Sequence, residues 1–169
     1  MKVILYMAMT VNGMIAREND DTPWSNVEWK NYAKKVKECG ALIVGRRTYE
    51  IMKKGDDLKK IGNPFTVVVT SQKIESNKSF VFAKSPKDAF EIMKKRKFRK
   101  VLLGGGSMIN ASFMKAGLVD EIYLDVEPFV FGKGIKLFSD EGFEAKLKLI
   151  GTKKLSKNEI QLHYKVIRR

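Results

Sequence analysis

Short apolar runs alternate with amphipathic segments along the first two thirds of the chain. The runs are typical of strands buried on both faces, and they cover residues 2–9, 41–44, 65–69, 79–83 and 100–103. Apolar residues at helical spacing predict helices between them, at 26–38, 48–52, from 85 onward and at 107–115. This alternation of strand and helix favours a mostly parallel sheet with helices on both faces.

The last third of the chain follows a period of two instead. Residues 121–127 alternate between apolar and polar, as expected of a half-buried strand. Residues 143–153 and 159–167 are typical of two long strands, joined by a hairpin turn at 155–158. The pattern therefore predicts a three-layer α/β fold with a mixed sheet and a C-terminal antiparallel hairpin. With 169 residues, we expect one domain spanning residues 1–169.

Composition narrows the chemistry that the chain can perform. Cys39 is the only cysteine and His163 the only histidine, which argues against an internal disulfide, a cysteine or histidine metal site and a Ser-His-Asp triad. No apolar run reaches the length of a membrane span, and the N-terminus lacks the pattern of a cleavable signal. We therefore expect a cytoplasmic protein without a metal, whose chemistry rests on carboxylates, backbone groups or a cofactor.

The net charge of +14 admits three interpretations. The basic run at residues 94–100 is the best candidate for a nucleic-acid surface. Lysines are, however, spread along the whole chain and no aromatic residues interleave the densest run, so solvated helix faces explain them better. A positive field would also raise the encounter rate with polyanionic ligands such as phosphorylated cofactors.

Polar or glycine-rich segments follow four of the predicted strands, at residues 12–13, 45–48, 70–72 and 104–107. The three glycines at 104–106 join a strand to a helix that Ser107 could cap. Alone, this turn fits a tight steric connection as well as a phosphate seat at a helix N-terminus. Because ligands of parallel sheets bind at the C-terminal ends of strands, the four segments together favour phosphate binding.

Glu28 is a notable carboxylate on the first predicted helix. It lies one turn before Tyr32, on or beside the apolar face that includes Trp29 and Val36. Such a group is either the solvated rim of a buried stripe or a side chain aimed into a pocket. Periodicity alone favours the solvated rim.

Several short motifs, in order along the chain, resemble the dihydrofolate reductase superfamily, which includes the pyrimidine reductase domain of riboflavin biosynthesis. They are Met7-Ala8, Asn12-Gly13, Ile15, Pro23-Trp24, residues 45–50, Thr70-Ser-Gln72 and Gly104-Gly-Gly106. The resemblance runs from residue 2 to about residue 167. It implies an eight-stranded mixed sheet, NADPH as the hydride donor and a small heterocycle as the acceptor.

The resemblance also assigns residues to the cofactor. The Ala8 backbone would face the nicotinamide, and residues 12–24 would form a mobile loop that closes over it. Arg46 and Arg47 would grip the pyrophosphate and 2′-phosphate region, with the glycine turn at 104–106 offering its backbone N–H groups. The full cofactor set is Ala8, Ile15, Gly45, Arg46, Arg47, Thr48, Thr70, Ser71, Gln72, Lys84, Gly104, Gly105, Gly106, Ser107, Met108 and Ile109.

On the substrate side, the resemblance gives Glu28 the place of the family's single active-site acid, with Trp24 as a second catalytic residue. A carboxylate can accept two hydrogen bonds from the 2-aminopyrimidine edge of a pterin and favour protonation of the ring as hydride arrives. The residues expected around the substrate are Tyr6, Ala8, Glu28, Tyr32, Met52, Leu103 and Asp125.

Three departures from dihydrofolate reductases complicate this interpretation. Pro64 stands where an arginine would hold the folate carboxylate, Asp125 replaces a threonine and could raise the pKa of Glu28, and Ile109 replaces a tyrosine. The segment from Pro128 to Phe138 resembles the riboflavin branch and dimeric thermophile dihydrofolate reductases. Its apolar part, Phe129–Ile135, is the expected homodimer contact.

Three functions therefore stay open. The first choice is NADPH-dependent reduction of a pterin, 7,8-dihydrofolate above all. The alternative is reduction of a ribosylaminopyrimidine phosphate in riboflavin biosynthesis, and a basic nucleic-acid-binding protein is the non-enzymatic one.

Overall fold

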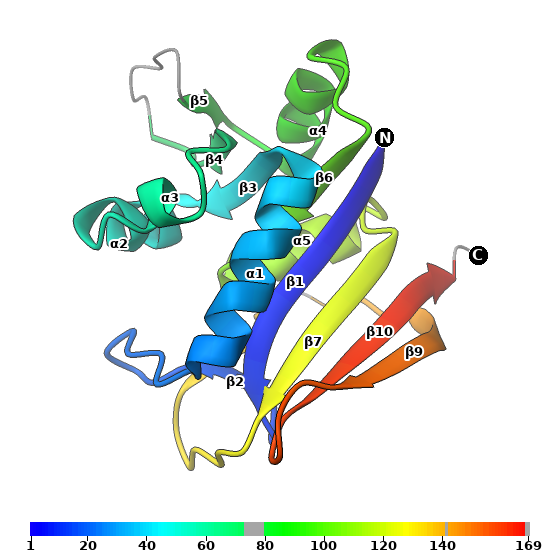
Figure 1. Ribbon diagram of the computed structural model, residues 1–169. Coiled ribbons are helices and arrows are strands. Elements are labelled where there is room, and N and C mark those ends of the chain that lie inside the picture. Colours follow the sequence, from blue (N-terminus) through cyan, green and yellow to red (C-terminus); the bar gives the residue numbers. More distant parts are fainter. Residues whose placement is uncertain (73–79, 141, 168–169) are drawn as a thin grey trace.

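A mixed sheet forms the middle layer of the molecule (Figure 1). The computed structural model describes residues 1–72, 80–140 and 142–167. Strands of the large sheet are β1 (Lys2–Thr10), β3 (Ala41–Gly45), β4 (Phe65–Val69), β5 (Phe80–Ala83), β6 (Lys100–Leu103), β7 (Glu121–Glu127), β9 (Lys146–Lys154) and β10 (Ile160–Ile167). A separate small sheet pairs β2 (Met14–Ala16) with β8 (Ile135–Lys136). Helices are α1 (Asn26–Cys39), α2 (Arg46–Lys54), α3 (Asp57–Lys60), α4 (Pro86–Lys95) and α5 (Ser107–Lys115).

The eight strands of the large sheet follow the order β5-β4-β3-β6-β1-β7-β10-β9. Neighbours from β5 to β7 pair in parallel, and β10 pairs antiparallel with both β7 and β9. The predicted α/β class, the eight-stranded mixed sheet and the C-terminal hairpin are thus confirmed. The order matters for function because it brings the C-terminal ends of six parallel strands to one edge of the sheet.

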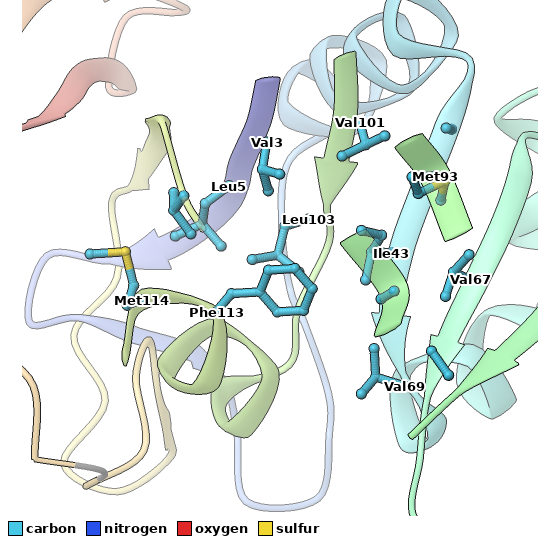
Figure 2. Close-up of a cluster of buried hydrophobic side chains, with 14 of the residues drawn as sticks. Val3, Leu5, Ile43, Val67, Val69, Met93, Val101, Leu103, Phe113 and Met114 are labelled. Carbon is cyan, nitrogen blue, oxygen red and sulfur yellow. The ribbon is translucent and has the colours of Figure 1, made fainter. Parts of the chain in front are cut away.

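Alternating side chains of the central strands pack into two hydrophobic cores, one on each face of the sheet. Figure 2 shows Val3, Leu5 and Leu103 packed against Phe113 of α5, and α4 covers the same face through Ala89 and Met93. The other face carries residues of α1, α2 and the intervening strands, namely Ile4, Tyr6, Val36, Leu42, Val44, Tyr49, Met52 and Leu102. Strand runs that are apolar at every position are explained by this two-sided burial.

Some element boundaries differ from the prediction. Helix α2 begins at Arg46 rather than at residue 48, because Gly45 is already its extended N-cap and the arginines are good helix formers. Helix α2 also extends to Lys54, beyond the predicted end at residue 52, and the short helix α3 follows it, with Leu58 packed on the core. Strand β9 begins at Lys146 rather than at residue 143. The predicted start of β5 at residue 79 lies outside the described residues.

Candidate functional site

Two glycine turns meet at the C-terminal edge of the sheet. The Gly45 N–H after β3 donates a 2.8 Å hydrogen bond to the Gly105 carbonyl after β6, and the Gly104 N–H donates to the Ile43 carbonyl at 2.9 Å. A Cβ placed on Gly106 would lie 3.5 Å from the Thr48 hydroxyl. The first turns of α2 and α5 therefore lie side by side, as the phosphate-binding prediction requires.

Steric room in this pair of turns depends on the absence of side chains. A Cβ on Gly45 would lie 2.8 Å from Cγ1 of Ile109, and one on Gly104 would lie 2.6 Å from the Tyr32 hydroxyl. Gly105 has φ +84°, a conformation that L side chains rarely adopt, and its peptide bond to Gly106 is cis. We call Gly45 and residues 104–106 the glycine cradle.

Helix α5 starts directly after the cradle without a side-chain cap. Gly106, not Ser107, is its N-cap residue, so the expected capping role of Ser107 is wrong. The first N–H groups of α5 are consequently not taken up by a capping side chain, which suits an anion seat. Met108 is largely exposed beside this turn, and Ile109 is half-buried.

Both arginines predicted to grip phosphate lie exposed on the first turn of α2, and each is paired with a carboxylate. Arg46 contacts Glu50 at 3.1 Å, one helical turn away. Arg47 donates through Nε and Nη2 to one oxygen of Asp20, at 2.9 and 2.6 Å. Asp20 belongs to the loop of residues 17–22, so this loop reaches the arginine end of the cradle.

The adenosine-side residues follow the two outer parallel strands. Thr70 comes directly after β4, its N–H donates to the Ala83 carbonyl, and its hydroxyl accepts from the Gln72 N–H at 3.2 Å. Ser71 and Gln72 are exposed, as is Lys84 after β5. Their roles toward a cofactor stay predictions, although their place at the same edge as the cradle agrees with them.

The loop expected to close over the nicotinamide is tied to the segment before β8. Asn12 donates to the Phe131 carbonyl at 2.7 Å and accepts from the Phe131 N–H at 3.3 Å. The Trp24 ring stacks on Phe131 with a centroid separation of 6.1 Å. Ile15, on β2, is buried. Trp24 thus packs in an aromatic cluster, and its catalytic role stays a prediction.

Glu28 lies buried at the same edge of the sheet, on the face that α1 covers. The Ser25 hydroxyl accepts the Glu28 N–H at 3.0 Å, which starts α1 and turns the Glu28 side chain toward the sheet. The side chain is only 5% exposed, so the interpretation as a solvated rim is wrong. Among the described residues, no hydrogen bond reaches its carboxyl group.

Three more carboxyl groups act on Glu28, two from β7 and one from the turn that precedes β10. Asp125 accepts from the Tyr6 hydroxyl at 2.5 Å and from Gln161 Nε2 at 2.7 Å. Glu127 accepts from the Ser25 N–H at 3.2 Å. Glu159 is buried, and its Oε2 has no hydrogen-bond partner in the described part of the chain. We call Glu28, Asp125, Glu127 and Glu159 the carboxyl cluster.

Burial and mutual repulsion raise the pKa values of Glu28, Asp125 and Glu127. Burial contributes most to the rise in the pKa of Glu28 to about 8, and the charges of Asp125, Glu127 and Glu159 add to it. The pKa values of Asp125 and Glu127 are also raised, mainly by burial, although the donors of Tyr6 and Gln161 lower that of Asp125. Burial raises the pKa of Tyr32 as well, and Glu28 adds to this shift.

Sequence reasoning found two members of this cluster and missed Glu127 and Glu159. A signal for Glu127 was available, because it lies two residues after Asp125 in a strand of period two and so shares its face. Glu159 stands just before Ile160, which pairs with Val126, and only the strand register reveals that neighbourhood.

The other residues expected around the substrate lie on both faces of the large sheet. Ala8 pairs with Asp125 across β1 and β7, and the Tyr6 and Tyr32 rings meet edge to face at 5.7 Å. Met52 is buried in the core beneath α1 and α2. The Leu103 side chain, in contrast, packs in the core beneath α5, on the face opposite Glu28, so a side-chain contact with the substrate is not supported (Figure 2).

An eight-stranded mixed sheet with the cradle and a buried acid at one edge places the chain in the dihydrofolate reductase superfamily. Within that class, the model of the RibD C-terminal domain matches residues 1–161, and the chain belongs to this family. The uncharacterized protein YwjB of Bacillus subtilis is 32% identical over 169 residues, which cover 96% of this chain and 97% of YwjB. Dihydrofolate reductase type 1 of Escherichia coli is 28% identical over 128 residues, 76% of this chain and 78% of that enzyme.

Solved structures show the same fold. A putative riboflavin biosynthesis protein from Shewanella sp. PV-4 has a TM-score of 0.83 and 19% identity, covering 99% of this chain and 100% of that one. The diaminohydroxyphosphoribosylaminopyrimidine deaminase/5-amino-6-(5-phosphoribosylamino)uracil reductase of Thermotoga maritima has a TM-score of 0.74 and 19% identity, covering 98% of this chain and 56% of that one.

Neither a metal site nor a membrane-spanning helix is present among the described residues. No group of three or more His, Cys, Asp or Glu side chains in the described ranges is arranged to hold a metal ion. Within the same ranges, no helix has the length and apolar character needed to cross a membrane.

Proposed function

We propose that this protein is an NADPH-dependent reductase of a ribosylaminopyrimidine phosphate of the kind used in riboflavin biosynthesis. Membership of the RibD C-terminal domain family supports this choice over a pterin reductase. The observation that carries the assignment as a reductase is the position of Glu28, a buried carboxyl group without a hydrogen-bond partner among the described residues, at the edge that also holds the glycine cradle. A ring bound at Glu28 would lie next to a cofactor bound at the cradle.

The cradle fits the pyrophosphate of NADPH. Helix α5 begins without a side-chain cap, so its first N–H groups are not taken up by a capping side chain, and the first turns of α2 and α5 lie side by side. Arg46 and Arg47 stand at the same edge and would hold further phosphate oxygens. When bound, NADPH would supply the hydride.

The protein's own residues would then bind and orient the substrate ring. Tyr6, Tyr32 and Trp29 surround Glu28 with aromatic surface, since Trp29 stacks on Tyr32 and Tyr32 meets Tyr6 edge to face. Glu28 would form the polar contact with the ring edge, and the loop of residues 12–24 would exclude water from the reacting atoms.

Dihydrofolate stays as the second candidate substrate. The buried acid on α1 favours it, because this is the position that the dihydrofolate reductases use for the pterin ring. Pro64 counts against it, since no arginine stands there to hold the folate carboxylate.

The proposal includes a homodimer that forms through Phe129–Ile135. Val130 in that segment is 71% exposed, so it is available for such a contact.

The deciding experiment is NADPH oxidation by the purified protein with 5-amino-6-(5-phosphoribosylamino)uracil and, separately, with 7,8-dihydrofolate. We expect turnover of the pyrimidine and little turnover of dihydrofolate. Turnover of dihydrofolate alone would replace the first candidate by the second. Absence of both activities together with absence of NADPH binding would refute the proposed reductase.

A further inference from the structure

The carboxyl cluster carries more negative charge than its surroundings can neutralise. Of the four groups, Asp125 receives two hydrogen bonds, from Tyr6 and Gln161, and Glu127 receives one from the Ser25 N–H. Glu28 and Oε2 of Glu159 receive none among the described residues. No lysine or arginine of the described residues forms an ion pair with any of the four.

Glu28, Asp125 and Glu127 take the neutral form more readily than exposed carboxyl groups do, because burial and repulsion both oppose their ionisation. The hydrogen bonds decide which group keeps its charge. Asp125 has two donors aimed at it and stays the best candidate for the carboxylate, whereas Glu28 has no donor and takes a proton most easily. The charge of Lys153 also lowers the pKa of Asp125, which further favours the ionised form of Asp125.

We propose that Glu28 binds the substrate in its neutral, protonated form and therefore selects the lactam edge of a uracil-type ring. This inference rests on the proposed function and names the ring that the site takes. A carboxylic acid has one O–H donor beside one carbonyl acceptor. A lactam presents the complementary pair, a carbonyl and the adjacent N–H, so the two groups form two hydrogen bonds without a net charge.

A pterin needs the opposite protonation state of the acid. Its 2-amino group and the neighbouring ring N–H form a two-donor edge, which matches an ionised carboxylate with two acceptors. The charged and titratable groups that act on Glu28 are Asp125 and Glu127 of β7, Glu159 of the β9–β10 turn, and the hydroxyl groups of Tyr6 and Tyr32. No cation lies in hydrogen-bond contact with Glu28 in the described ranges. Such surroundings disfavour the carboxylate that a pterin requires.

Glu159 is assigned a positioning role in this arrangement. It stands on the turn between β9 and β10, which lies beside the C-terminal end of β7 (Figure 1). Its charge acts on Glu28, Asp125 and Glu127, while its own Oε2 is buried and out of reach of a ligand. Glu159 therefore adds to the rise in the pKa of Glu28, after burial, Asp125 and Glu127, without touching the ring.

The variant Glu28→Gln separates the two protonation states, because an amide also has one donor face and one acceptor and cannot ionise. With the aminouracil substrate, we expect E28Q to retain a clearly larger kcat/KM than E28A and to lose the fall in activity that the wild type shows as pH rises through about 8. E28A should lose kcat/KM by about 30-fold, since both ring hydrogen bonds disappear. Glu38→Gln, at the exposed end of α1, is the matched control. Loss of activity in E28Q as large as in E28A would overturn the inference.

A second readout does not depend on turnover. The infrared difference spectrum of wild type minus E28Q should contain the carbonyl band of a protonated carboxylic acid at pH 6.5, and the band should fade as pH rises through about 8. Glu159→Gln should move this fading to lower pH. Failure of the proposed function would leave this band in place, whereas its absence at pH 6.5 would overturn the inference even if the aminouracil is turned over.

Discussion

The Tyr32 hydroxyl occupies the space that a side chain on residue 104 would need, because a Cβ built on Gly104 lies only 2.6 Å from that oxygen. The contact joins helix α1, which carries Glu28, to the glycine cradle after β6. It therefore fixes the spacing between the substrate side and the cofactor side of the site. Leu42 and Val44 close the same space, at 3.0 and 3.3 Å.

Gly104→Ala should destabilise the protein by about 1–3 kcal/mol, since the added methyl group forces these side chains apart in a packed region. Thermal or denaturant unfolding measures the effect. Adding Tyr32→Phe should recover part of the loss, because it removes the nearest atom. Gly132→Ala is the control, as nothing lies within 4 Å of its Cβ. Equal stability of G104A and wild type would show that Tyr32 moves away freely.

Glu28 should make the folded state less stable as pH rises. Its folded pKa of about 8 lies above the ordinary value of 4.5, so the folded protein binds this proton more tightly than the unfolded chain. The stabilisation is complete below pH 4.5 and is lost as pH rises through about 8. Relative to E28Q, the wild type should lose on the order of a few kcal/mol over this window. Urea unfolding of both proteins at several pH values tests this, and parallel curves would contradict it.

The architecture of the sheet was predictable because each strand carries its own signal. Runs such as residues 41–44 and 65–69 are apolar at every position, and two-sided burial is the physical reason. The glycine cradle was predictable as well, since its backbone needs residues without side chains. The apolar runs and the glycines are both visible in a short stretch of sequence, so neither prediction requires knowing which strand lies alongside.

The carboxyl cluster was not predictable in the same way. Glu28 sits beside the apolar face of α1, where periodicity describes it as a rim residue, and only the end of β7 and the β9–β10 turn bury it. Glu159 meets it across more than a hundred residues of chain. The pairing of Arg47 with Asp20 likewise depends on where the loop of residues 17–22 folds back. Such long-range neighbours leave no trace in local pattern.

Tyr6→Phe should destabilise the folded protein by about 1–3 kcal/mol, because Asp125 then loses its shortest hydrogen bond while it stays buried. The remaining donor, Gln161, cannot compensate for both contacts. Unfolding measurements beside Tyr164→Phe provide the comparison, since the Tyr164 hydroxyl has no hydrogen bond in the described part of the chain. An equal effect of the two variants would mean that the Tyr6–Asp125 bond adds nothing to stability.

Asp20 should compete with the cofactor for Arg47. Both guanidinium contacts of Arg47 go to one oxygen of Asp20, and a phosphate that binds there must displace this carboxylate. The pair is exposed and therefore weak, so Asp20→Asn should tighten NADPH binding by up to about fivefold.

The matched control is Asp21→Asn, which removes the neighbouring carboxylate that pairs with Arg17 and leaves Arg47 untouched. Titration of NADPH into the three proteins by calorimetry gives the dissociation constants, and the gain for D20N should shrink at high salt because the contact is electrostatic. Arg47→Ala should weaken binding and cancel the effect of D20N in the double variant. Weaker NADPH binding by D20N would instead indicate that Asp20 holds Arg47 in the orientation that the phosphate needs.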